Sequence, residues 1–508
     1  MSNAKQDLNT REKKDSQWTN PLARPPTKWY QLNKRIELFP WWVRYHLGIV
    51  GEARLRKMII EQGHSLGLQD KWMQRIIRHA ISEFSKKGLG PDYYGYHNIN
   101  HEFEATLVCL LAAKGNNENS KYKSFSKEDI MYLFSGALFH DYDPLKQFDK
   151  PHEDAVEWFI RYDHNIKKFI DALGIDLDIL IALIHRTAYP FKGEIGEHAA
   201  LRMQELFTIA GIPLENLRRR EHFEDLGWFL SVSERIAGYA LWDFERAKEL
   251  ARRNAHALGW HPSLINEESV KYFSGLKEER EMFDRVITSI PEEYRLNYFR
   301  NVASFRELWE KEVEIGSSVR KGRITLMSLL EDVTRLEPYV KDAVHTIYKE
   351  LFVPIRINNE MEFDDSLSDE KTIVLTLRIK EDFKKIVGYV KGGPLERYKL
   401  RHGTSDANYG KGNTVFMEWT SIRPGYWGNG GGHTLRMGLL NEAKKRGYSF
   451  LTSYVHRDVL IRRINAGEKI EMVQKYDPDK LDYYRTDLKN SYFAQAEIVD
   501  PALSNVEV

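Results

Sequence analysis

The stretch Tyr96-His97-Asn98-Ile99-Asn100-His101 and the later pair His140-Asp141 decide how the first half of the chain folds. His97 and His101 are spaced i, i+4, which on a helix places them on one face. The pair His140-Asp141 follows the apolar run 130–139, so one imidazole and one carboxylate would lie together at the end of a buried helix. Neutral imidazole and carboxylate suit Zn, Mn, Fe or Mg, depending on geometry. In a chain with 17 histidines an HxxxH pair alone arises by chance, so the combination carries the metal hypothesis.

The sequence around these motifs predicts an all-α domain. From about residue 29 to 320 the apolar residues recur at helical spacing, as in 76–84, 103–113, 155–160, 177–184 and 226–240. The chain has one cysteine, Cys109, so it forms no internal disulfide and no thiolate-only zinc site. Because Cys109 lies in the apolar run 107–113, we expect it to be a buried small residue.

Composition excludes several classes of protein. The 508 residues suggest two to four domains, and 75 basic residues nearly balance 74 acidic ones, so no nucleic-acid partner is expected. No apolar stretch is long enough to span a bilayer, and residues 1–28 lack the apolar core of a secretory signal. We therefore expect a cytoplasmic protein with small-molecule substrates, a flexible tail at 1–28 and another at 496–508. Its oligomeric state stays open.

The second half of the chain changes character near Gly322. We expect a strand at 323–330, a helix at 331–352, and strands at 372–378, 386–390 and 414–422. A helix at 434–446 and a strand at 449–455 follow. This order predicts an α/β domain with a mixed sheet, at residues 321–495, after the helical domain at 29–320.

A glycine-rich loop precedes the last of these helices. It reads Arg423-Pro-Gly-Tyr-Trp-Gly-Asn-Gly-Gly-Gly-His433. A loop between a strand and a helix presents free backbone N–H groups at the helix N-terminus, and glycine lets the backbone approach an anion closely. A flexible loop is the commonest meaning of a glycine run, but this position favours pyrophosphate binding. The predicted cradle consists of Trp427, Gly428, Asn429, Gly430, Gly431 and Gly432.

The motifs YHNINH and HDYDP resemble the HD superfamily of metal-dependent hydrolases, in its cyclic nucleotide phosphodiesterase branch, over about residues 70–315. The resemblance implies that His97 is the general acid that protonates the leaving oxygen. The metal ligands it implies are His101, His140 and Asp141, with Glu234 as the distal carboxylate. His185 is either a further ligand, of the kind that other HD branches use, or a core histidine.

Departures from the family pattern bear on the substrate. Pro144 stands where the family has a histidine, and the late helix at 293–299 lacks the glutamine that clamps a purine. Asn297 is the nearest amide there. We therefore expect a phosphoester substrate other than cyclic AMP or cyclic GMP. Some HD proteins are di-iron oxygenases that use more histidine ligands, and His152 and His185 leave that alternative open.

The loop and its flanking elements resemble the GNAT acyltransferases over about residues 322–490. Gly430 and Gly432 match the family's glycines, whereas Trp427 stands where Arg or Gln is usual. The resemblance implies acetyl-CoA or another acyl-CoA as cofactor, and Glu418 as a candidate general base. The tyrosine that serves as general acid in the family would fall near 463–464, where this chain has no tyrosine.

Together these features predict a bifunctional enzyme, in which a phosphodiesterase-like hydrolase that uses divalent Mn, Mg, Zn or Fe is joined to an acyl-CoA-dependent N-acyltransferase. Two alternatives stay open. The first is a di-iron oxygenase joined to the same acyltransferase domain. The second is a regulatory protein whose C-terminal domain only senses acyl-CoA.

Overall fold

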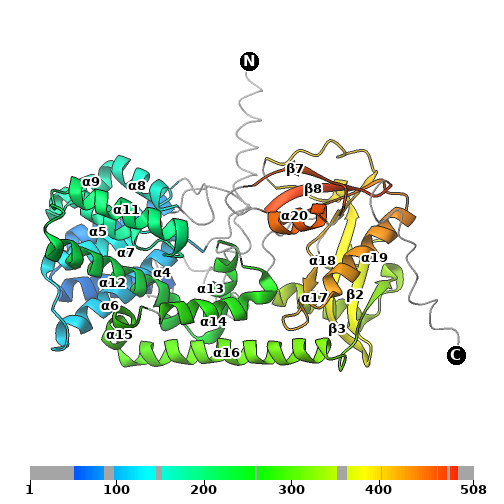
Figure 1. Cartoon of the computed structure of the whole chain (residues 1–508), viewed down its shortest axis with the longest axis horizontal. Helices are drawn as coiled ribbons and strands as arrows, with labels where there is room; N and C mark the ends of the chain where they lie inside the picture. Colours follow the sequence, from blue (N-terminus) through cyan, green and yellow to red (C-terminus); the bar gives the residue numbers. More distant parts are fainter. Residues whose placement is uncertain are drawn as a thin grey trace, which may run out of the picture. The chain divides into compact units, whose positions relative to one another are not determined.

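The computed structural model describes most of the chain and divides into two compact units (Figure 1). The residues that it describes are 51–84, 96–144, 152–257, 260–277, 279–351, 363–401, 403–465, 467–476 and 481–489. The tails expected at 1–28 and 496–508 lie outside these residues. Of these described residues, those within 1–258 and 266–307 form the helical unit, and those within 259–265 and 308–508 form the sheet unit.

The division between the units falls inside helix α16 (Glu292–Arg320), after Glu307, rather than at residue 320. The last turns of α16 belong to the sheet unit because Ile315 and Val319 pack against its core. The short segment 259–265 also belongs to the sheet unit, although the helices on both sides of it belong to the helical unit.

The helical unit contains only helices among its described residues, as its apolar spacing predicts. Its central helix is α6, which packs against α4, α7, α12 and α15. A helix with buried side chains on every face lies inside a domain, and α6 buries the run 105–113 completely, Cys109 included. The helices are α4 (Gly51–Ser65), α5 (Asp70–Phe84), α6 (Ile99–Glu118), α7 (Lys127–Phe139), α8 (Glu153–Tyr162), α9 (His164–Leu173), α10 (Leu177–His185), α11 (Gly193–Ile209), α12 (Leu217–Leu241), α13 (Phe244–Ala257), α14 (Ile265–Leu276) and α15 (Arg280–Ser289).

The sheet unit is built on an eight-stranded mixed sheet. Seven strands follow the order β1-β2-β3-β4-β6-β8-β7, and β5 pairs with β3. The pair β4·β6 is parallel, and the other pairs are antiparallel. The strands are β1 (Leu326–Glu331), β2 (Ile373–Ile379), β3 (Asp382–Pro394), β4 (Thr414–Met417), β5 (Ser421–Ile422), β6 (Phe450–His456), β7 (Ile470–Gln474) and β8 (Leu481–Asp487).

Helices cover both faces of this sheet. Strand β2 is buried along its whole length, and its alternate residues join two different cores. Leu375 and Leu377 pack in the core under α19 (Gly431–Lys445), whereas Val374 packs in the core under α17 (Pro338–Glu350). The sheet is therefore the middle layer of three, as a buried strand in a mixed α/β domain requires.

The expected single strand at 414–422 is wrong in one respect. It is broken into β4 and β5, because residues 418–420 leave the ladder and Ser421 then pairs with Tyr389 of β3. The helix α20 (Arg457–Asn465) and the strands β7 and β8 complete the unit beyond the last strand predicted from the sequence.

No helix among the described residues is long and apolar enough to cross a membrane. The cytoplasmic location stays a prediction.

Candidate functional site

The motif histidines of the helical unit meet where α6 begins and α7 ends. Asn98 caps α6 by accepting a hydrogen bond from the Asn100 amide, 2.8 Å away, so the helix begins at Ile99. His101 therefore lies in the first turn of α6, while His97 precedes the helix and does not share its face, contrary to the expectation from the i, i+4 spacing. His140 and Asp141 follow the last residue of α7.

Three ligand atoms in this place form a small triangle. His101 Nε2 lies 3.2 Å from His140 Nε2, and Asp141 Oδ2 lies 3.3 Å from the first and 3.2 Å from the second. Nitrogen and oxygen ligands bound about 2.0–2.2 Å from one ion, at roughly 90–109° to each other, would be about 3.0–3.5 Å apart. The residues therefore fit a single divalent ion, and these three belong to a four-residue group, buried except for the partly buried Asp141, that could hold one.

The fourth residue of that group is Glu102, which the sequence analysis did not name. Glu102 is fully buried, and its Oε2 lies 3.1 Å from Nδ1 of His140. The same Nδ1 is 3.0 Å from the Ala137 carbonyl oxygen. An Nδ1–H donated to that carbonyl leaves the lone pair of Nε2 facing the triangle, as a ligand imidazole requires. The signal for Glu102 was a carboxylate beside His101, a few residues before the apolar run 107–113 of the same helix.

Electrostatics in the triangle favour an ionised carboxylate. Burial alone would raise the pKa of Asp141, but attraction from His140 and His97 holds that pKa well below its usual range. Burial would likewise lower the pKa of His140, but Asp141 and Glu102 raise it well above its usual value. The group thus concentrates opposite charges in a place with little solvent.

The other predicted residues lie at different distances from this triangle. His97 Nε2 is 3.9 Å from Asp141 Oδ2, close to the triangle but outside it. Glu234, in α12, is near enough that His140, Arg235 and His101 each lower its pKa, although burial raises the pKa more. His152 is exposed at the N-cap of α8.

His185 is not brought into the group. Its Nε2 lies 2.9 Å from Glu157 Oε2, and the same carboxylate accepts hydrogen bonds from Arg161 and Arg202. Attraction from these partners outweighs the effect of burial and lowers the pKa of Glu157. His185 is therefore paired with a carboxylate outside the four-residue group, and its role as a further ligand stays a prediction.

In the sheet unit, the glycine loop lies between β5 and α19, as predicted. Gly428 and Gly430 have φ angles of 77° and 83°, which L side chains rarely adopt, so the loop needs glycine there. The side-chain Nδ2 of Asn429 donates a hydrogen bond to the Trp427 carbonyl at 3.0 Å, within the turn. Helix α19 begins at Gly431, and the N–H groups of its first turn have no partner inside the helix.

The two glycines that open α19 have different roles. A Cβ on Gly431 would lie 2.5 Å from Leu377 Cδ2, so this glycine lets the helix pack closely on β2. A Cβ on Gly432 would meet Ile422 and Trp427 at 3.6 and 3.8 Å, which is ordinary contact. Close packing on the sheet, rather than approach to an anion, therefore explains Gly431.

The parallel pairing of β4 and β6 ends beside this loop. The parallel ladder of β4 and β6 covers only three pairs, and the last is Phe416↔Thr452. Beyond this pair β6 continues to His456 with β8 as its partner, while β5 pairs with β3 and not with β6. The two parallel strands thus separate toward their carboxyl ends, on the side where α19 begins.

A histidine from outside the predicted domain lies against the loop. His261 stacks on Trp427, with ring centroids 3.8 Å apart and planes 24° apart. It precedes the short helix η3 (Pro262–Leu264), and Ser263 Oγ donates to the Ile422 carbonyl at 3.0 Å. Nδ1 of His261 accepts the Ser263 amide, and burial lowers the pKa of the ring to about 3. The sequence carried no local signal for this contact.

Glu418 follows β4 and is already paired. Its Oε1 lies 2.9 Å from the Nζ of the buried Lys391 and accepts a hydrogen bond from the Tyr398 hydroxyl at 2.9 Å. A general-base role would have to compete with both contacts.

A tyrosine hydroxyl does reach the place where the local sequence lacks one. Tyr484, on β8, accepts a hydrogen bond from Arg463 Nη1 at 2.9 Å. Burial would raise the pKa of Tyr484, but Arg463 and Arg436 lower it below its usual value. Tyr484 lies about 20 residues beyond 463–464 in the sequence, so no local pattern pointed to it.

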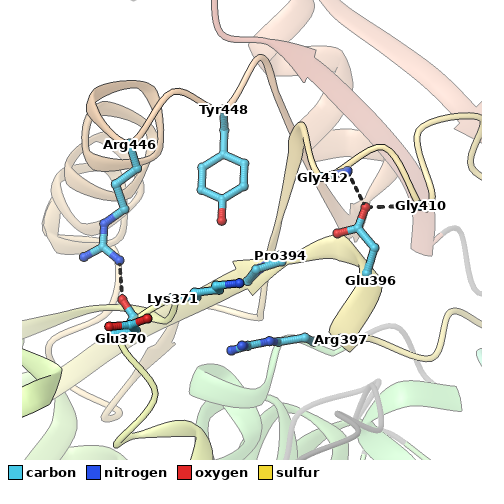
Figure 2. A pocket seen from close by; sticks show the side chains of 9 residues that line it. All are labelled: Glu370, Lys371, Pro394, Glu396, Arg397, Gly410, Gly412, Arg446 and Tyr448. Atoms are coloured by element: carbon cyan, nitrogen blue, oxygen red, sulfur yellow. Dashed lines mark hydrogen bonds between the residues drawn. The ribbon is translucent and has the colours of Figure 1, made fainter.

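A separate cavity of about 590 Å³ lies at the other end of α19 (Figure 2). Its lining includes Glu396, Arg446 and Tyr448, and Figure 2 shows Glu396 accepting the amides of Gly410 and Gly412. Arg446 donates to the Glu370 carbonyl and to Glu442. Glu396 and Arg446 are therefore bonded to the protein itself, and the cavity is remote from the glycine loop.

Comparison with known proteins identifies relatives of the sheet unit. Residues 341–465 match the model of the acetyltransferase (GNAT) family. YhbS, a GNAT N-acetyltransferase of Escherichia coli solved in complex with CoA, is 15% identical, with 32% of this chain and 82% of that chain covered and a TM-score of 0.21. A GNAT acetyltransferase of Staphylococcus aureus Mu50 is 13% identical, with 32% and 100% covered and a TM-score of 0.22. No curated protein matches the chain. The family match runs from α17 to the end of α20.

Proposed function

We propose that the sheet unit, which carries a GNAT acetyltransferase domain, transfers an acyl group from acyl-CoA to an amine of a small molecule. The observation that carries this proposal is the loop that ends at Gly430 and leaves the first-turn amides of α19 without partners inside the helix. Such amides and the helix dipole act together on an anion, here the pyrophosphate of CoA. Binding of CoA by a related structure, YhbS, supports the same ligand.

The cradle would rely on backbone groups more than on charge. Trp427 stands where a cationic or amide side chain is usual, and its ring is already stacked on His261. Arg423, the cation of the loop, donates to both carboxylate oxygens of Glu350.

In the reaction the thioester C–S bond breaks, a C–N bond forms, the amine loses a proton and the thiolate gains one.

The test measures CoA binding and acyl transfer with the full chain. We expect CoA to raise the melting temperature, by about 2.7 kcal/mol of stabilisation at 100 times its dissociation constant. Thiol release from acetyl-CoA should depend on an added amine. The variant Gly432→Leu should lose the shift, because a bulky side chain beside Trp427 crowds the first-turn amides.

A matched control is Gly275→Leu, at a helical glycine whose Cβ would have no neighbour within 4 Å. A shift that survives Gly432→Leu places CoA elsewhere. CoA binding without transfer to any amine favours the alternative in which this unit only senses acyl-CoA.

The second candidate function is metal-dependent hydrolysis of a phosphoester by the helical unit. It is supported by the triangle of His101, His140 and Asp141, whose spacing suits one divalent ion. A bound divalent ion would lower the pKa of a water ligand toward neutrality and screen phosphoryl charge. His97, beside the triangle but outside it, is placed to protonate a leaving oxygen.

Cyclic AMP and cyclic GMP remain disfavoured as substrates. Asn297, the amide nearest to the expected purine clamp, donates its side-chain N–H groups to the Ala240 and Trp242 carbonyls. Metal analysis of the purified protein tests the hydrolase against its alternative. Bound Mn, Mg or Zn with phosphoester turnover supports the hydrolase, whereas retained iron without such turnover supports the di-iron oxygenase.

A further inference from the structure

Two arginines are buried in the helical unit with side-chain nitrogens that lack hydrogen-bond partners. Arg186 follows α10 and is 1% exposed, and Arg235 lies in α12 and is 6% exposed. All three side-chain nitrogens of Arg186 lack a hydrogen-bond partner, as do Nε and Nη2 of Arg235. Guanidinium groups are always charged and carry five N–H donors, so burial in this state is strongly unfavourable.

Other buried arginines in the same chain are satisfied by the protein. Arg220, 2% exposed, donates to four oxygen-bearing residues, including the Pro213 and Ile212 carbonyls. Arg378, in the sheet unit and 1% exposed, donates from Nε, Nη1 and Nη2 to Thr376, Tyr339 and Glu331. These two buried arginines thus have acceptors for every side-chain nitrogen, whereas Arg186 has none and Arg235 lacks them at two nitrogens.

Aromatic rings, rather than acceptors, hold Arg186 in place. Its guanidinium lies over the ring of Phe191, 3.5 Å from the centroid, and against the ring of Trp228. Contacts of this kind occupy the faces of the guanidinium plane and leave its N–H edges available. A rigid fork of this type matches the two oxygens of a carboxylate or phosphate.

One carboxylate lies between the two arginines. Glu279 Oε1 is 3.9 Å from Arg186 Nη2 and 3.6 Å from Arg235 Nη1, beyond hydrogen-bond length in both cases. Glu234 Oε1 lies 3.8 Å from Arg235 Nε and is also the candidate distal ligand of the metal group. The carboxylates nearby thus balance part of the charge but supply no acceptor to the free N–H groups.

We propose that Arg186 and Arg235 bind an oxyanion, the phosphate or carboxylate group of a small molecule used by the helical unit. Glu234 Oε1 lies 3.8 Å from Arg235 Nε, and His140 and His101 act on the pKa of the same carboxylate, so this anion site adjoins the candidate metal group. We therefore assign the anion to the substrate. The assignment of this anion to a substrate rests on the proposed hydrolase activity, whereas anion binding by the two arginines does not depend on that activity.

The experiment titrates the full-length protein with inorganic phosphate and, separately, with succinate, using calorimetry. We expect at least one of them to bind. Arg235→Lys keeps the charge but loses the fork, and affinity should fall roughly tenfold or more, the effect of one lost charge-assisted hydrogen bond. Arg220→Lys is the matched control, a buried arginine of the same unit, and should change the affinity less than twofold.

A second variant should change the affinity for the oxyanion in the opposite direction, and it leaves both arginines in place. Glu279→Gln removes the carboxylate that competes for both guanidinium groups, so the oxyanion should bind more tightly. Failure of both anions to bind the folded wild type, or equal affinities in wild type, Arg235→Lys and Glu279→Gln, would overturn the proposal.

The variant Asp141→Asn separates this site from the metal group. Anion binding that persists in Asp141→Asn while metal and turnover are lost places the anion on the arginines. Loss of anion binding together with the metal, with Arg235→Lys unaffected, places it on the metal instead and overturns the proposal. Absence of hydrolysis with intact anion binding contradicts only the hydrolase.

Discussion

Gly431 and Gly432 are neighbours in the first turn of α19, and the structure predicts different responses to the same change. In Gly431→Ala the new methyl carbon would lie 2.5 Å from Leu377 Cδ2, well inside the usual contact of about 3.5–4.0 Å. Forcing a methyl group into a packed core costs about 1–3 kcal/mol. In Gly432→Ala the methyl would lie 3.6 Å from Ile422, so we expect local stability to change by less than about 0.5 kcal/mol.

The assay is hydrogen–deuterium exchange of the full chain, because a two-unit protein has no single free energy of unfolding. Peptides from β2 and α19 should exchange roughly 5–150 times faster in Gly431→Ala, the equivalent of about 1–3 kcal/mol. They should be nearly unchanged in Gly432→Ala. Equal protection in the two variants would refute the argument that Gly431 is required for packing against Leu377.

Three further predictions concern single side chains. Asp141→Asn should lose the divalent metal measured by elemental analysis, whereas His185→Ala should retain it because His185 lies outside the triangle; metal loss in both would contradict this geometry. Glu418→Ala should destabilise the sheet unit by about 3–5 kcal/mol, since it leaves the Lys391 ammonium buried without its carboxylate. Exchange rates near β3 would check this, and an unchanged rate would count against it. Burial raises the pKa of the Cys109 thiol to about 12, so the folded chain at pH 8 should not react with a thiol reagent.

The sequence by itself determined the features that repeat over short distances along the chain. Helical spacing of apolar residues predicted the helices around the metal group, and the run around Cys109 predicted its burial. The strand, glycine loop and helix around residue 430 were also predicted, because positive φ angles and a helix start depend on neighbouring residues. The position of His140 and Asp141 directly after α7 was also predicted, because the end of a helix depends on neighbouring residues.

Tertiary structure alone decided which of these residues meet. His185 has the same residue type as the metal ligands, but helix packing pairs it with Glu157, and no local pattern specifies that partner. Packing likewise places His261 on Trp427 in the sheet unit. It also leaves Arg186 without an acceptor, a fact that no composition or spacing could reveal. The physical reason is that periodicity is a property of adjacent residues, whereas hydrogen-bond partners and buried charges depend on segments brought together only when the chain folds.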